Sequence, residues 1–307
     1  MKKKSDNDRG LMRRQTLIAV KVCFLFLAVC IISPSPSWAA SGGWKWRFDL
    51  VSPEAKSPFL MPTSLFIEVG SKRFYVVESG GGSLHSFQFD GSYLNTFSPG
   101  DALKQPFAMA RDVKLGTLWV VEKGRNSLTK IDLKAKKLSP ETLKFKGEIV
   151  YPDRLTMLDD KLYVLNKLSG DVIAYNQDLA SLAVYKSPGE GFIDFIVKNS
   201  ELWALDSRMK TISRFNLKGK LKEQITLADN VSFPVAVEIG PSGFLYVLDK
   251  HQGAIVVFDS SGKFKYSFLQ KGHTKNRLYL PENIVFDPLG RLCVVDTGNG
   301  RIGIFSR

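Results

Sequence analysis

A sixfold internal repeat constrains this sequence more than any other feature. Each copy has a short apolar strand ending in an acid or amide, then a polar turn, then a second alternating strand. The second residue of each copy marks a period of 44, 44, 40, 43 and 47 residues, at Tyr75, Trp119, Tyr163, Trp203, Tyr246 and Cys293. A period of this length is typical of one four-stranded blade. The sequence therefore predicts an all-β fold, a six-bladed β-propeller of four-stranded antiparallel blades.

A further strand precedes each marker, and proline opens it in five of the six copies. These prolines are Pro62, Pro106, Pro152, Pro234 and Pro281. Proline has no N–H, so it is tolerated at the first residue of a strand, where no ladder hydrogen bond is lost. Because the innermost strand of each blade lines the central channel, we expect the residues after each proline at the channel mouth.

The last copy lacks a fourth strand, because the chain stops at Arg307 directly after the third. An open sheet edge invites aggregation. One unpaired strand, WKWRFDL at Trp44–Leu50, precedes the first copy. We expect this N-terminal strand to close the ring as the outer strand of the last blade.

The final copy, LPENIVFDPLGRLCVVDTGNGRIGIFS, resembles the NHL repeat, and FPVAVEIGPSGFLYVLDKHQGAIVVFDSSG is similar. The resemblance implies one NHL-type six-bladed propeller over residues 40–307. Related six-bladed folds include lyases with zinc and lactonases with a calcium-like ion, so the resemblance leaves catalysis open. Fold alone does not establish it.

Residues 1–39 are expected to be a cleaved signal peptide. Lys2–Lys4, Arg13 and Arg14 precede an apolar stretch, and Ser37 and Ala39 supply small residues before the cut. The sequence therefore predicts a periplasmic or extracellular protein. An uncleaved N-terminal anchor that tethers the protein to a membrane is the alternative. Cleavage leaves Cys293 as the single cysteine, which excludes an intrachain disulfide.

The mature chain stays basic. Without residues 1–39, the 43 Lys and Arg fall to 36 and the 30 Asp and Glu to 28, so a net charge of +13 becomes +8. Such a field attracts acidic partners. A protein or peptide is the partner we expect first and an anionic glycan second, whereas export argues against nucleic acid.

Two sets of residues are candidate binding residues on the face that carries the channel mouth. The mouth set is Asp153, Arg154, Asp194, Glu282 and Asn283. The basic rim is Lys123, Arg125, Lys167, Arg208, Lys250, His251 and Arg301. The acids and amides that end the second strands recur in every blade, which favours a structural task in tying down turns.

No catalytic motif stands out. Three histidines, His85, His251 and His273, are too scattered for a zinc centre. Asp153, Asp194 and Glu282 are candidates for a calcium-like ion, although acids beside Arg154 could equally form a salt-bridged plug. The sequence favours a non-catalytic binding protein without a cofactor, and a metal-dependent hydrolase or lyase, lactonase-like, at the channel mouth is the alternative.

Overall fold

The computed structural model describes residues 43–53, 57–112, 114–135 and 137–307, which lie in the compact unit Ala39–Arg307. The expected signal peptide lies outside these residues. Among the described helices, none has the length and apolar character needed to cross a membrane.

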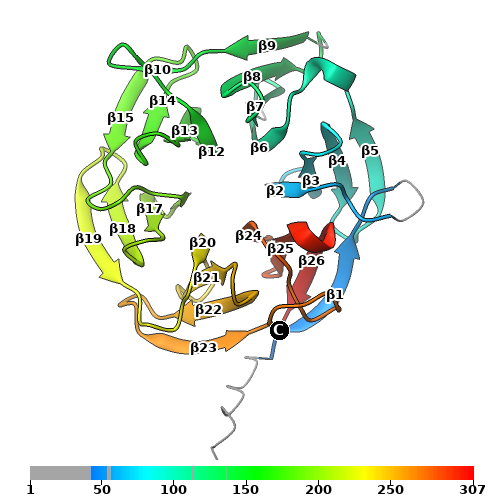
Figure 1. The fold of residues 1–307 in the computed structure, drawn as a ribbon. Helices are drawn as coiled ribbons and strands as arrows, with labels where there is room; N and C mark the ends of the chain where they lie inside the picture. Colours follow the sequence, from blue (N-terminus) through cyan, green and yellow to red (C-terminus); the bar gives the residue numbers. More distant parts are fainter. Residues whose placement is uncertain (1–42, 54–56, 113, 136) are drawn as a thin grey trace, which may run out of the picture. The chain divides into compact units, whose positions relative to one another are not determined.

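Six four-stranded antiparallel sheets form a ring (Figure 1). Blade 1 consists of β2 (Pro62–Glu68), β3 (Arg73–Glu78), β4 (Ser83–Gln88) and β5 (Tyr93–Phe97). Blade 2 consists of β6 (Pro106–Asp112), β7 (Thr117–Glu122), β8 (Ser127–Asp132) and β9 (Lys137–Glu141). Blade 3 consists of β12 (Pro152–Leu158), β13 (Lys161–Asn166), β14 (Val172–Tyr175) and β15 (Ser181–Tyr185). Blade 4 consists of β16 (Asp194–Lys198), β17 (Glu201–Asp206), β18 (Thr211–Asn216) and β19 (Leu221–Thr226). Blade 5 consists of β20 (Pro234–Ile239), β21 (Leu245–Asp249), β22 (Ala254–Phe258) and β23 (Phe264–Phe268). Blade 6 consists of β24 (Asn283–Phe286), β25 (Leu292–Asp296), β26 (Arg301–Ser306) and β1 (Lys45–Leu50). The remaining elements are a hairpin, β10 (Lys144–Phe145) with β11 (Glu148–Ile149), and two 3₁₀ turns, η1 (Gly100–Ala102) and η2 (Thr297–Asn299).

The N-terminal strand closes the ring as expected. β1 pairs antiparallel with β26, from Lys45 opposite Ser306 to Leu50 opposite Ile302. Leu50 is buried in a core cluster that also contains Phe74 of blade 1. The first strand in the chain therefore satisfies the edge that the last strand would otherwise expose.

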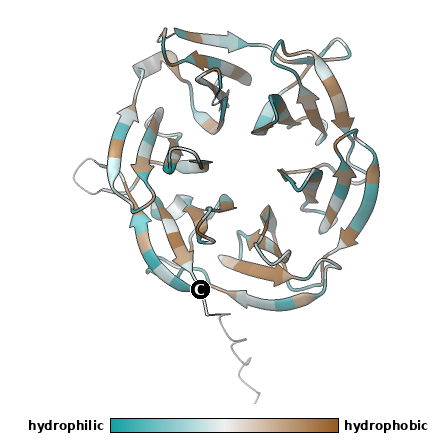
Figure 2. Ribbon diagram, turned by 180° about the vertical axis from the view of Figure 1, so that it is seen from behind, coloured by the Kyte–Doolittle hydropathy of each residue, from teal (hydrophilic) through white to brown (hydrophobic). Residues whose placement is uncertain are grey.

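Apolar side chains pack between neighbouring blades. Every residue of β21, β22 and β25 is buried, whereas almost all of β19 is exposed. Figure 2 shows the same trend, with hydrophobic residues gathered on strands and hydrophilic ones on loops and outer strands. Tyr246 of blade 5 meets Phe286 of blade 6 edge-on at 4.9 Å between ring centroids.

Proline opens the innermost strand in four blades, at Pro62, Pro106, Pro152 and Pro234, which confirms the prediction there. Pro281 precedes β24, which begins at Asn283. The turns between second and third strands lie beside these openings. For example, the Lys250 N–H donates to the carbonyl of Phe233 at 3.0 Å. We call the face formed by these openings and turns the mouth face.

Candidate functional site

The acid or amide at the end of each second strand has the structural role that its recurrence suggested. In all six blades it accepts a backbone N–H from the segment that enters the same blade, at Leu60, Lys104, Tyr151, Glu190, Ser232 and Tyr279. Asp249 also accepts the N–H of Gln252 in its own turn at 2.9 Å. These carboxylates and the amide therefore fix the mouth-face loops.

Arg154 closes the channel at the mouth face. Its side chain is 10% exposed and lies 3.9 Å from Asp194 and 3.8 Å from the Glu282 carboxylate. It also donates to the carbonyl of Glu282 at 3.1 Å and covers the ring of Phe107 at 4.8 Å. The channel behind it has a volume of about 530 Å³. The salt-bridged plug that the sequence left open is thus present.

Two lysines flank this plug. The Lys123 ammonium contacts the Asp153 carboxylate, and the Lys250 ammonium contacts Glu282. Burial, helped by the charges of Lys167 and Arg154, lowers the pKa of Lys123. The carboxylate in direct contact acts the other way, so we treat Lys123 and Asp153 as an ion pair.

Asp194 is the most deeply buried acid of the group. Burial raises its pKa to about 6, while Arg154 and the Val237 N–H, which donates to it at 2.9 Å, favour the charged form. At neutral pH Asp194 is therefore ionised, and Arg154 is the cation beside it.

The remaining predicted residues are more scattered. Asn283 lines the channel, Arg125 bonds Glu122 and the carbonyl of Ala102, and Arg208 pairs with Glu190 at 3.3 Å. The His251 ring stacks on Phe233 at 4.6 Å, and Lys167 is exposed in its turn.

The expectation that Arg301 lies on an exposed rim is wrong. It is only 9% exposed and pairs with Asp296 at 2.9 Å and Asp49 at 3.2 Å. Two backbone carbonyls, of Thr274 and Arg277, take its remaining donors. Arg301 therefore ties β1 into the last blade.

Six exposed apolar side chains on the mouth face were not predicted from the sequence, because only charged and polar residues were candidates for binding there. They are Leu60, Met61, Leu168, Met209, Phe233 and Leu280. Three of them directly precede a blade-opening proline, and this placement is the signal that could have found them. We call these six residues the apolar ring.

The three candidate metal ligands do not fit a cation. Asp194 and Glu282 both face Arg154, and Asp153 contacts Lys123. Within the described ranges, no group of three His, Cys, Asp or Glu side chains converges closely enough to hold a metal ion. Each candidate carboxylate thus already has a protein cation beside it.

The ring of six four-stranded sheets makes this chain a six-bladed β-propeller. Residues 278–305, which contain β24, β25 and most of β26 in the last blade, match the NHL repeat family.

Solved structures with the same fold are distant in sequence. A streptogramin B lyase is 14% identical with a TM-score of 0.63, covering 87% of this chain and 99% of its own. A catalytically inactive virginiamycin B lyase from Staphylococcus aureus with quinupristin is 16% identical, with a TM-score of 0.60 and 81% coverage of both chains. A gluconolactonase from Xanthomonas campestris is 14% identical, with a TM-score of 0.60, covering 86% of this chain and 95% of its own. At such identities the likeness concerns the fold.

Proposed function

We propose that this protein is an exported binding protein that docks an acidic protein partner on its mouth face. The observation that carries the proposal is the apolar ring, six exposed large apolar side chains on one face of the propeller. Exposed apolar surface rimmed by polar residues is typical of protein interaction sites.

The charges around the apolar ring favour an acidic partner. Exposed Lys167 sits beside Leu168, exposed Arg208 beside Met209, and exposed His251 stacks on Phe233. Arg, Met and Phe, present here as Arg208, Met209 and Phe233, are residue types enriched in protein interfaces. The +8 charge of the mature chain would speed the encounter.

The plug supports docking on the surface over insertion into the channel. Arg154 is held by two carboxylates and two carbonyls, so entry at this end requires breaking buried ion pairs. Breaking such pairs is costly. A partner that rests on the apolar ring avoids that cost.

Affinity capture from the native envelope tests the proposal. The bait variants are Leu168→Asp with Phe233→Asp on the mouth face, and, as the matched control, Val69→Asp with Leu289→Asp, two exposed apolar residues in turns of the opposite face. A protein retained by wild type and control, lost by the mouth-face variant and released by salt supports the proposal. Retention by the mouth-face variant contradicts it.

A metal-dependent hydrolase or lyase is the second candidate, because the similar solved structures include lyases and a gluconolactonase. The cations beside Asp153, Asp194 and Glu282 weigh against it. Metal analysis of the purified mature protein separates the two. A stoichiometric calcium or zinc ion that is lost in Asp153→Ala or Glu282→Ala would favour the enzyme.

We further propose export with cleavage after Ala39, which rests on the sequence of the first residues. Mass spectrometry of the protein from its native cells should find Ala40 as the first residue. A membrane-bound chain that keeps residues 1–39 would instead establish the tethered form.

A further inference from the structure

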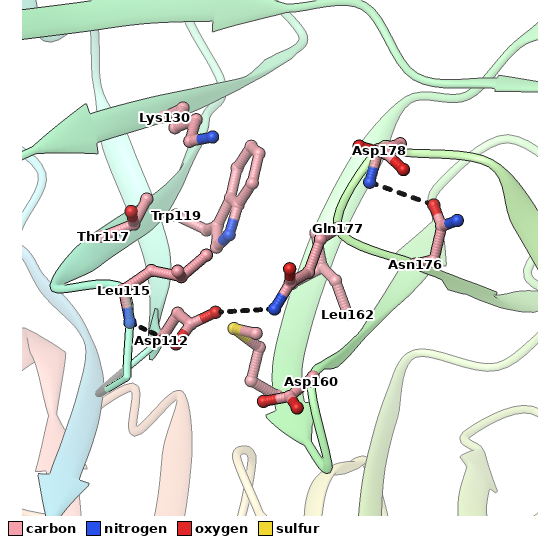
Figure 3. Close-up of a pocket in the computed structure, with 11 residues that line it drawn as sticks. Asp112, Leu115, Thr117, Trp119, Lys130, Asp160, Leu162, Asn176, Gln177 and Asp178 are labelled. Atoms are coloured by element: carbon pink, nitrogen blue, oxygen red, sulfur yellow. Dashed lines mark hydrogen bonds between the residues drawn. The ribbon is translucent and has the colours of Figure 1, made fainter.

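A pocket of about 150 Å³ lies between blades 2 and 3, on the face opposite the mouth (Figure 3). We call it the junction pocket and define it by Asp112, Trp119, Lys130, Met157, Gln177 and Asp178. Its residues come from the β6–β7 hairpin, from β8 and β12, and from the β14–β15 turn. It shares no residue with the plug or the apolar ring.

The corresponding contact between blades 1 and 2 explains why the junction pocket is open. Between blades 1 and 2, Glu68 pairs with Arg111 at 2.7 Å, and both contact the hydroxyl of Tyr75. Counted from the blade-opening prolines, Met157 stands where Arg111 stands, and Asp112 where Glu68 stands. The second junction therefore keeps the acid but replaces its cation with a thioether.

Two donors in the junction pocket have no protein acceptor. Trp119 is 5% exposed and lines the pocket, and its indole N–H has no hydrogen-bond acceptor among the residues that the structure describes, although the nitrogen itself is not fully buried. Figure 3 shows the indole nitrogen on the side of the ring that faces Asp112 and Leu115. The Lys130 ammonium lies 5.5 Å from the Trp119 ring centroid, and no carboxylate of the described part is within ion-pair distance of it. Donors that border a pocket without a protein partner can be satisfied there by a ligand or by water.

Acceptors face the same space. One oxygen of the buried Asp112 accepts the Leu115 N–H at 3.0 Å, and the other has only a 3.5 Å contact with Gln177. Exposed Asp178 adds a second carboxylate at the rim, and Asp160, which pairs with Lys114 at 2.8 Å, adds a third. The side chains of Leu115 and Met157 supply apolar wall.

We propose that the junction pocket binds a single neutral sugar ring. A hydroxyl group both donates and accepts, so neighbouring hydroxyls can donate to Asp112 while accepting from Trp119 and Lys130. An anion would be repelled by the carboxylates, and a cation would leave the indole N–H of Trp119 and the ammonium of Lys130 without a hydrogen-bond acceptor. A cavity of about 150 Å³ holds a benzene molecule, so the sugar ring would occupy the pocket while its outer hydroxyls reach the rim at Asp178, and the C–H face of the ring suits the walls formed by Leu115 and Met157.

Ligand-observed NMR titration of the mature protein with glucose, galactose, mannose and N-acetylglucosamine tests the proposal. Each sugar is offered free and as its methyl glycoside. Saturable binding of at least one supports the proposal, and the ratio between the two forms tells a free sugar from the end of a glycan. The absence of saturable binding across the panel overturns it.

Three variants locate the binding. Trp119→Phe removes the unpaired N–H and should weaken binding about tenfold, the typical effect of one lost hydrogen bond. Trp203→Phe is the matched control, because its indole N–H likewise has no partner but is buried outside the pocket. Met157→Arg recreates the pair seen between Glu68 and Arg111 and should abolish binding by filling the space. Sugar binding that survives in Met157→Arg, or that falls equally in Trp203→Phe, overturns the proposal.

Discussion

Replacing Arg154 with methionine should destabilise the protein in a pH-dependent way. The variant keeps most of the side-chain volume but leaves Asp194 buried without its cation. At their separation of 3.9 Å, the attraction is worth about 4 kcal/mol for an effective dielectric constant of about 20. Asp194 can avoid part of this loss by taking up a proton.

Protonation of Asp194 limits how much unfolding free energy Arg154→Met can lose. With a pKa of about 6, protonating Asp194 at pH 8 costs about 2.7 kcal/mol. We therefore expect Arg154→Met to lose about 3 kcal/mol of unfolding free energy at pH 8 from this source. At pH 5 Asp194 is already mostly protonated, so the loss from this source should be small.

The direction of the pH dependence of stability follows from the linkage between protonation and folding. A carboxyl whose folded pKa exceeds its unfolded value contributes stability below the unfolded pKa, near 4, and this contribution falls as pH rises toward the folded pKa, about 6. In wild type the decline from Asp194 ends near pH 6. In Arg154→Met the folded pKa is higher still, so the decline should continue toward pH 8.

Urea denaturation at pH 5, 6 and 8 measures these free energies. The control is Arg154→Met with Asp194→Asn, which removes the titrating group and should abolish the extra decline between pH 6 and pH 8. An equal loss for Arg154→Met at pH 5 and pH 8, or the same decline in the double variant, would refute the reasoning.

Three further predictions concern the framework. Deleting Trp44–Leu50 exposes the β26 edge and should cause aggregation, seen as loss of the monomer peak or of heat stability relative to the full mature chain; an equally soluble and heat-stable truncation would contradict the closure. Asp249→Ala leaves backbone N–H groups at the blade 5 entry without an acceptor and should cost about 2 kcal/mol in chemical denaturation, whereas Asp90→Ala, at an exposed turn, should cost far less; equal costs would contradict the structural role. Burial raises the pKa of the Cys293 thiol, so a thiol reagent should react only after unfolding, and reaction in the native protein would show that the thiol is accessible.

The fold follows from sequence because each blade repeats one pattern. The spacing of the markers, the prolines and the unpaired strand at Trp44–Leu50 determine six blades and the closure before any coordinate is known. The plug was also within reach, since Pro152 places Arg154 at the channel mouth and the alignment of the fourth copy, GFIDFIVK, with the others places Asp194 there.

Side-chain contacts between residues far apart in the sequence were out of reach. Arg301 was assigned to the rim because its turn is on the mouth face, but its second carboxylate, Asp49, belongs to β1 at the other end of the chain. The junction pocket depends on which side chain of blade 3 opposes Asp112, and only the packing of neighbouring sheets shows that this is Met157.

Site-specific photo-crosslinking in the native cells tests the central claim, docking on the mouth face, most directly. The photoreactive residue replaces Leu168, 77% exposed on the mouth face, or Leu289, 65% exposed on the opposite face. A discrete protein adduct from position 168, with none from position 289, is the predicted result. Adducts from position 289 alone, or identical adducts from both positions, would contradict the claim.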